Sequence, residues 1–257
     1  MSKLVFFLTF LFFNVLFAND HQQKYLDDML SVANDVLSCY HTLEESGQNI
    51  IQQVLKGEES FFEWDHYPSG EVEDKQTHCQ YFYHSHREGE HGHFHLFINE
   101  KGIPDHFEPL YTPQPDKEKR VYTHLISISM DDYGYPQGFF TVNQWVTGGN
   151  MYSAADMAYF IEKFKVELSI PSKEVNIWMQ ALLKLYYPII VSLFEERDIA
   201  LKQQLAFREL DTILSDKNIE ILSETTICVD EYIENLKNRI AVSKKPQEIL
   251  GARGDKK

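Results

Sequence analysis

Histidines alternate with other residues on both sides of a short polar link in the stretch Tyr81–Phe97. This stretch holds five of the eleven histidines of the chain, namely His84, His86, His91, His93 and His95. A β-strand sends alternate side chains to opposite faces, so each run places its own histidines on a single face. The pattern therefore predicts two strands that each carry a histidine face.

If the link 87–90 closes a β-hairpin, directly opposed residues share a face, with Cβ atoms about 4.5–5.5 Å apart. The opposed pairs are then His86 with His91, His84 with His93, and Phe82 with His95. This register gathers all five imidazoles on one face and leaves apolar side chains on the other: Tyr81, Tyr83, Phe94 and Leu96. A slip of one residue would mix histidines with aromatic residues on both faces, so we expect the first register.

Neutral imidazole is the commonest metal ligand in proteins, and three or four of them bind zinc, iron, copper or nickel. Two histidines one residue apart on a strand, with a third from the next strand, suit a zinc ion with an open water position. We therefore predict a divalent transition metal, zinc first and iron or copper as alternatives. The predicted ligands come from His84, His86, His91, His93 and His95. Glu90 is the nearest carboxylate and is a candidate ligand or general base.

Other polar residues near the predicted hairpin are weaker candidates. Asp65, His66 and Glu73 lie on the preceding segment, where ordinary turn and surface roles are equally expected. His78 comes just before the hairpin, and no role is assigned to it. His124 lies in a later predicted strand, in alternation with Ile126 and Ile128, and is likewise unassigned.

The first eighteen residues resemble a secretory signal peptide. Lys3 precedes the apolar run 4–13, and a small residue, Ala18, stands before a polar stretch. We expect cleavage after Ala18 and a periplasmic or secreted protein. The alternative is an uncleaved anchor, for which the apolar run is short. No second transmembrane segment is expected. The three cysteines (Cys39, Cys79 and Cys228) are too few for a disulfide framework, although an oxidising compartment would allow one bridge.

The charge of the chain limits its partners. The formal net charge is −15 at pH 7, and no basic stripe with interleaved aromatic residues occurs. Such a chain repels phosphate backbones, so nucleic acid is not an expected partner. The expected partners are a metal ion and a small molecule of unknown identity.

The remaining segments predict an α+β fold. A helical pair is expected over Asp20–Lys56, broken at Ser46–Gly47. Irregular structure is expected over Glu58–Gln80 and over the proline-rich segment Gly102–Lys119. Besides the hairpin, strands are expected at Val121–Met130 and Phe139–Thr147.

The C-terminal part of the chain reads as a set of helices. Ser153 begins the first of them, and Pro171 and Pro188 interrupt the set. The run Glu195–Asp198 reads as a solvated helix face. We expect a signal peptide at 1–18, a single α+β domain at 19–242 with an antiparallel sheet of about four strands, and a disordered tail at 243–257.

Several of these segments resemble the core of an uncharacterised bacterial family, a domain of unknown function. The segments are His66–Asp74, Gln80–Arg87, Glu90–Phe97, His124–Asp131 and Asn143–Gly148. The resemblance covers roughly His66 to Arg197. A serine is usual in the family where this chain has Cys79, so the resemblance assigns no chemistry to that thiol. It implies kinship and no known activity.

The sequence leaves three functions open. The first is an exported metal-binding protein, which would be an enzyme if the ion activates water or binds oxygen. The second is a binding module that holds a metal or haem without turnover. The third is an interaction domain whose histidines sense pH.

Overall fold

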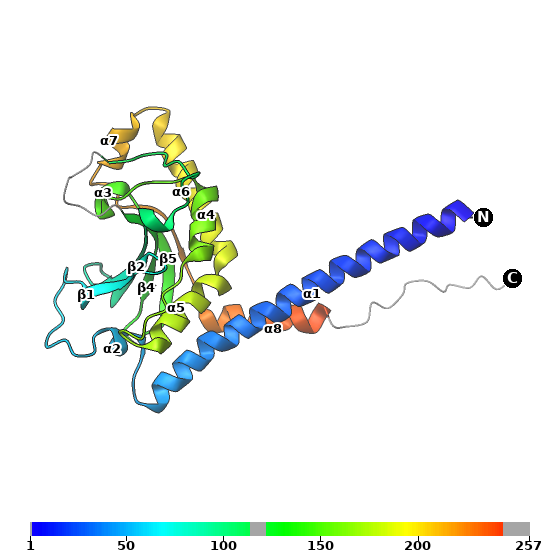
Figure 1. Cartoon of the computed structure of the whole chain (residues 1–257), viewed down its shortest axis with the longest axis horizontal. Coiled ribbons are helices and arrows are strands. Elements are labelled where there is room, and N and C mark those ends of the chain that lie inside the picture. Colours follow the sequence, from blue (N-terminus) through cyan, green and yellow to red (C-terminus); the bar gives the residue numbers. More distant parts are fainter. Residues whose placement is uncertain (1, 114–121, 244–257) are drawn as a thin grey trace. The chain divides into compact units, whose positions relative to one another are not determined.

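The computed structural model describes residues 2–113 and 122–243, with side chains described from His21 onward. Its centre is one antiparallel sheet in which each of six strands pairs with its neighbours in the sequence (Figure 1). The strands are β1 (Tyr67–Asp74), β2 (Cys79–His84), β3 (Gly92–Asn99), β4 (Tyr122–Met130), β5 (Pro136–Val142) and β6 (Ile221–Thr226). The predicted α+β class is confirmed, and the sheet is larger than the expected four strands.

The predicted register of the histidine hairpin is confirmed where the strands are paired. His84 lies opposite His93, and Phe82 lies opposite His95. The extension of this register to His86 and His91 is wrong, because β2 ends at His84 and β3 begins at Gly92. Residues 85–91 therefore form a loop, and strand alternation does not place the two histidines of this loop on the same face.

The two strands that the sequence did not predict are the edges of the sheet. β1 contains Pro68 and Gly70, and its pairing with β2 is interrupted by a bulge between Tyr67 and Val72. Proline and bulges are tolerated at sheet edges, where one row of backbone groups needs no partner. β6 is partly exposed and lacks a clear alternation. Edge strands of this kind give weak sequence signals.

The strand predicted at Phe139–Thr147 is shifted towards the N-terminus. β5 occupies Pro136–Val142, and the short helix α3 (Gln144–Thr147) follows. Asn143 is fully buried, and its side chain donates hydrogen bonds to the carbonyl oxygens of Ile213 and Ile219. Its Oδ1 also accepts from the Gln144 N–H, which caps α3. These hydrogen bonds end the strand at a point that the apolar pattern did not mark.

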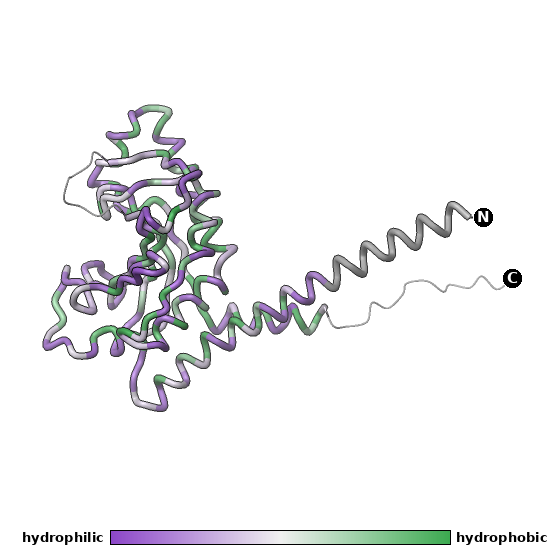
Figure 2. Tube along the Cα trace, viewed as in Figure 1, coloured by the Kyte–Doolittle hydropathy of each residue, from purple (hydrophilic) through white to green (hydrophobic). Residues whose placement is uncertain are grey.

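Helices α4 (Ala154–Lys163), α5 (Lys173–Leu185) and α6 (Tyr187–Leu205) lie along one side of the sheet (Figure 1). Ser153 and Ser172 cap the first two, as each side chain accepts a hydrogen bond from a backbone N–H of the first turn. Hydrophobic and hydrophilic residues alternate along these helices (Figure 2). The apolar stripes pack on the sheet, where Trp178 of α5 contacts Phe94 of β3.

The prediction of a solvated face at Glu195–Asp198 is wrong for Arg197. Its side chain is buried and donates hydrogen bonds to the Tyr152 carbonyl oxygen (2.6 Å) and to Asp198 Oδ1 (2.7 Å). A buried guanidinium requires partners of this kind. The hydrogen bond from Arg197 of α6 to Tyr152 therefore holds the segment before α4 against α6.

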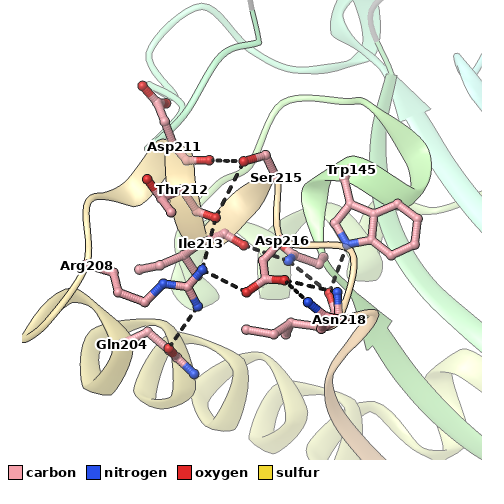
Figure 3. A network of polar contacts seen from close by, with 11 residues as sticks. Trp145, Gln204, Arg208, Asp211, Thr212, Ile213, Ser215, Asp216 and Asn218 are labelled. Atoms are coloured by element: carbon pink, nitrogen blue, oxygen red, sulfur yellow. Dashed lines mark hydrogen bonds and ion pairs between the residues drawn. The ribbon is translucent and has the colours of Figure 1, made fainter.

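A polar network connects the end of α6 to the short helix α7 (Leu210–Leu214) and to the start of β6 (Figure 3). Arg208 Nη2 donates to Asp216 Oδ2 at 2.7 Å. Trp145 Nε1 donates to the Ile219 carbonyl oxygen at 2.9 Å. These bonds satisfy the polar groups of an otherwise irregular connection and bring β6 to the edge of the sheet.

The described part of the chain divides into two compact units. One combines the residues up to Ser31 with those from Asp230 on, and the other lies between them. The predicted helical pair is confirmed: α1 (Ser2–Glu45) begins in the first unit and ends in the second, and α2 (Ile50–Val54) follows. In the first unit, α1 and α8 (Val229–Ser243) each bury a stripe of apolar residues, which includes Leu26, Met29, Ile233, Leu236 and Ile240. The predicted tail lies, from residue 244 on, outside the described residues.

Two further expectations concern membranes and cysteines. From His21 onward, where the structure describes the side chains, no single helix has both the length and the apolar composition needed to cross a bilayer. The pair α5 and α6, which meets at an angle of 69°, passes this test only when taken together. Cys39, Cys79 and Cys228 are all free thiols, so the bridge that an oxidising compartment would allow is not formed here.

Candidate metal centre

Three strands carry histidines to the face of the sheet that lies opposite α5. β2 supplies His84, and β3 supplies His93 and His95. β4 adds His124 through a bulge: Leu96 pairs with Ile126, but Phe97 pairs with His124, so Leu125 is an extra residue. A bulge reverses the alternation of side chains, and it turns His124 towards His95.

The Nε2 atoms of three imidazoles converge. His93 Nε2 lies 2.8 Å from His84 Nε2 and 3.0 Å from His95 Nε2. Ligand nitrogens of a tetrahedral zinc ion, each about 2.0–2.1 Å from the metal, are about 3.3 Å apart. The observed spacing is therefore short of this geometry by about 0.3–0.5 Å, which small side-chain rotations supply.

Glu90 fixes the tautomer of His93. Its Oε1 lies 2.5 Å from His93 Nδ1, and its Oε2 accepts a hydrogen bond from the Ser129 hydroxyl. Burial by itself raises the pKa of Glu90, but the bonds from His93 and Ser129 outweigh it and lower the pKa below its ordinary value. An ionised carboxylate only accepts, so we infer that His93 Nδ1 carries the proton. His93 Nε2 then directs its lone pair at the other two histidines.

His95 is held from behind by groups of β4. Its Nδ1 lies 2.8 Å from Ser127 Oγ and 2.9 Å from His124 Nε2. If Nδ1–H is the donor in these contacts, His95 Nε2 and His93 Nε2 are both bare lone pairs 3.0 Å apart. A metal ion or a shared proton between the two nitrogens would relieve their repulsion. If instead the Nε2 atoms of His84 and His95 both carry protons, His93 Nε2 has to accept two hydrogen bonds through one lone pair.

His86 reaches the same centre from the loop after β2. Its ring stacks on Trp64 with centroids 4.2 Å apart and lies edge-on to His84 and His93, at 4.7 and 5.0 Å. Trp64 is 66% exposed and has a positive φ of 73°. The Trp64 N–H donates to the Ser85 carbonyl oxygen. The segment before β1 thus covers the solvent side of the centre with an aromatic ring.

The weaker candidates lie around the cluster rather than in it. His66 stacks on Phe82 and is edge-on to His84, while its Nδ1 bonds to Glu71 Oε1 at 2.7 Å. Glu71 also accepts from Gln80 Nε2. Asp65 lines an open surface pocket together with His66, and Glu73 accepts from the Tyr122 hydroxyl.

Two of the histidines named from the sequence lie elsewhere. The prediction that His91 shares the histidine face is wrong in its geometry. His91 Nδ1 lies 2.7 Å from the hydroxyl of Tyr83, which belongs to the other face, and its ring stacks on Phe61. His78 lies in the β1–β2 turn with a positive φ of 61°. The cluster therefore consists of His84, His86, His93, His95 and His124.

Four of the five histidines in the cluster are neutral at physiological pH. Burial, followed by the neighbouring His93, lowers the pKa of His84 to about 2 and the pKa of His86 to a smaller extent. Burial, His93 and Arg197 lower the pKa of His124 to about 3, and burial lowers the pKa of His95 strongly. Neutral imidazoles are the form that binds metals, so no proton has to leave these rings first.

The ligand atoms of His84, His86 and His93 all lie within 4.8 Å of one another, which would let them hold one metal ion. His84 Nδ1 is buried and has no hydrogen-bond partner among the described residues. The sequence reasoning missed the supporting hydroxyls of Ser127 and Ser129. They alternate in the predicted strand Val121–Met130, which was the available signal.

Comparison with known proteins gives a family without an activity. A family model described as Domain of unknown function (DUF6969) matches residues 30–227. No curated protein and no solved structure matches the chain. The matched residues include the whole histidine cluster and all six strands, so both belong to the family domain. By this match, which spans more than half of its length, the chain belongs to the family Domain of unknown function (DUF6969).

Proposed function

We propose that this chain is a metal-binding protein in which His84, His86 and His93 hold one divalent transition metal ion. The observation that carries the proposal is the close approach of their ligand atoms, all within 4.8 Å. Zinc is the first choice because three histidines and an open position are typical of catalytic zinc, and iron or copper would accept the same nitrogens. His95 Nε2 lies 3.0 Å from His93 Nε2, so His95 would contact a group bound to the ion.

Glu90 supports the proposed site best as a positioning residue. Both of its oxygens accept hydrogen bonds, and its pKa lies below the ordinary value, which makes it a weak base. A carboxylate that accepts from the second nitrogen of a ligand histidine fixes the ring and raises its basicity. We therefore assign Glu90 to hold His93 rather than to take a proton from a substrate.

The other two functions fit the cluster less well. The imidazole rings pack against one another with centroids 4.5–5.0 Å apart, which suits a small ion better than a flat macrocycle. His84, His93 and His95 are at most 7% exposed, so they are not a wet surface array for sensing pH. A metal-dependent enzyme is favoured over a storage site because three histidines leave a coordination position open.

Elemental analysis of the untagged protein tests the proposal. We expect near one equivalent of transition metal in the wild type and almost none in a folded His84→Ala/His93→Ala variant. A matched His41→Ala/His106→Ala variant, which removes two histidines outside the cluster, should keep the metal. Equal metal content in all three proteins, or none in the wild type, would refute the site. His86→Ala should also lose the metal, whereas His95→Ala should keep it.

We also propose that the protein is exported, on the strength of the basic, apolar and small residues within the first eighteen. The periplasmic or secreted protein should begin at Asn19. Intact mass measurement of the protein from each cell fraction tests this, and a full-length cytoplasmic species alone would contradict it.

A further inference from the structure

The positively charged side chain of Arg87 lies beside the histidine cluster and does not belong to it. Arg87 follows His86 in the β2–β3 loop, and its guanidinium carbon lies 4.4 Å from the centroid of the Phe140 ring. The Phe140 ring in turn is edge-on to His93, with centroids 5.2 Å apart. An aromatic face holds a guanidinium flat and leaves its N–H groups available at the edge. Arg87 thus lies over a ring that itself packs against His93 of the candidate metal site.

The present ion pair of Arg87 is a loose one. Its Nη2 lies 3.6 Å from Glu224 Oε2, and the Glu224 side chain is 64% exposed. By contrast, Arg197 and Arg208 each bond their carboxylate partners at 2.7 Å. Charge-assisted bonds are about 2.7–2.9 Å long, and exposed pairs beyond that range contribute little. A second carboxylate can therefore displace Glu224 from the guanidinium at small cost.

The charges around the site favour an anion rather than a cation. Glu90 is the buried carboxylate of the cluster, and both of its oxygens are already bonded to His93 and Ser129. A divalent ion held by the histidines would bring two positive charges beside the guanidinium of Arg87. Of the carboxylates described here, Glu90 is fully bonded and Glu224 is a loose, exposed partner. The planar fork of arginine matches the two oxygens of a carboxylate.

We propose that Arg87 and the metal ion together form a subsite for a small monocarboxylate, which binds the ion through its open position and accepts hydrogen bonds from the guanidinium. The inference rests on the proposed function, because it needs the ion. It names the substrate class of that site as a small molecule with a carboxylate group. Arg87 is then a specificity-determining residue and not a metal ligand.

Cobalt(II) as the probe metal makes the inference testable, since its visible spectrum reports on what occupies its coordination positions. The full chain is loaded with cobalt and titrated with acetate and, separately, with imidazole, a neutral ligand that needs no arginine. The variants are Arg87→Gln, Arg87→Lys and Glu224→Gln. Arg208→Gln is the matched control, because Arg208 is of similar exposure and also pairs with a carboxylate.

We expect equal cobalt binding in all proteins, and acetate binding about tenfold weaker in Arg87→Gln than in the wild type. Arg87→Lys should restore part of the affinity, and Glu224→Gln should increase it, whereas imidazole binding should be the same throughout. Cobalt binding with identical acetate affinity in wild type and Arg87→Gln would overturn this inference alone. No cobalt binding in the wild type would overturn the proposed function and this inference together.

Discussion

The two faces of the β2–β3 hairpin are equally buried and chemically opposite. On one face, Tyr81, Phe94 and Leu96 are fully buried, and this face packs against α5, where the Tyr81 hydroxyl bonds to Asn176. On the other, His84, His93 and His95 are at most 7% exposed, and their Nε2 atoms approach one another. Burial alone therefore does not distinguish a core from a site. The partners of the buried atoms do.

The largest expected effect separates the stability of the two faces. Phe94→Ala removes a fully buried ring that contacts Tyr81, Tyr83 and Trp178. We expect a loss of about 3–5 kcal/mol in the free energy of unfolding, measured by urea titration of the metal-free protein. Metal content per folded molecule should be unchanged. A loss below about 1 kcal/mol would show that this face is not the core of the hairpin.

Glu90→Gln should act mainly on the histidine face. The amide no longer accepts a charge-assisted bond from His93 Nδ1, so we expect metal affinity to fall about 10–100-fold, measured by competition with a chelator. Glu59→Gln, at an exposed position, is the control and should keep full affinity. Unchanged affinity in Glu90→Gln would remove Glu90 from any role in positioning His93.

The pH dependence of stability reports on the neutral histidines. In the unfolded chain, His84 has its ordinary pKa of about 6.5. In the folded protein, burial and the neighbouring His93 lower the pKa of His84 to about 2. Above about pH 6.5, His84 is unprotonated in both states and the free energy of unfolding of the metal-free protein does not depend on it. As the pH falls from about 6.5 towards 2, only the unfolded chain protonates His84, so the free energy of unfolding decreases by about 1.4 kcal/mol per pH unit for this group. Urea titrations at several pH values check the slope.

A His84→Gln variant is the control for this slope, and it should lose less stability than the wild type between pH 6.5 and 5. Equal slopes in the two proteins would contradict the neutral state of His84.

The smallest expected effect concerns His91, which the sequence grouped with the metal ligands. His91→Ala leaves the Tyr83 hydroxyl without its partner and should cost about 1 kcal/mol of stability. Metal content, measured by elemental analysis, should stay at the wild-type level. Loss of metal with unchanged stability would instead return His91 to the ligand set and erase the difference between the faces.

Local patterns predicted the elements with strong periodicity and clear boundaries. The serine caps of α4 and the break at Ser46–Gly47 are each set by neighbouring residues, and both were correctly read. The edge strands β1 and β6 were not, because their pairing comes from β2 and β5 and their own sequences carry bulges or polar residues. The buried position of Arg197 was also missed, since its partner Tyr152 lies 45 residues away.

By itself the sequence determined the hairpin register and the face of His84, His93 and His95, because alternation along a strand is a local property of the backbone. Only the tertiary structure decided the fate of the remaining histidines. A bulge opposite Phe97 turns the His124 side chain towards the cluster. The path of the β2–β3 loop places His86 against Trp64, and the contact of His91 with Tyr83 keeps His91 outside the cluster. These outcomes depend on pairing between strands and on loop packing, which no short stretch of sequence encodes.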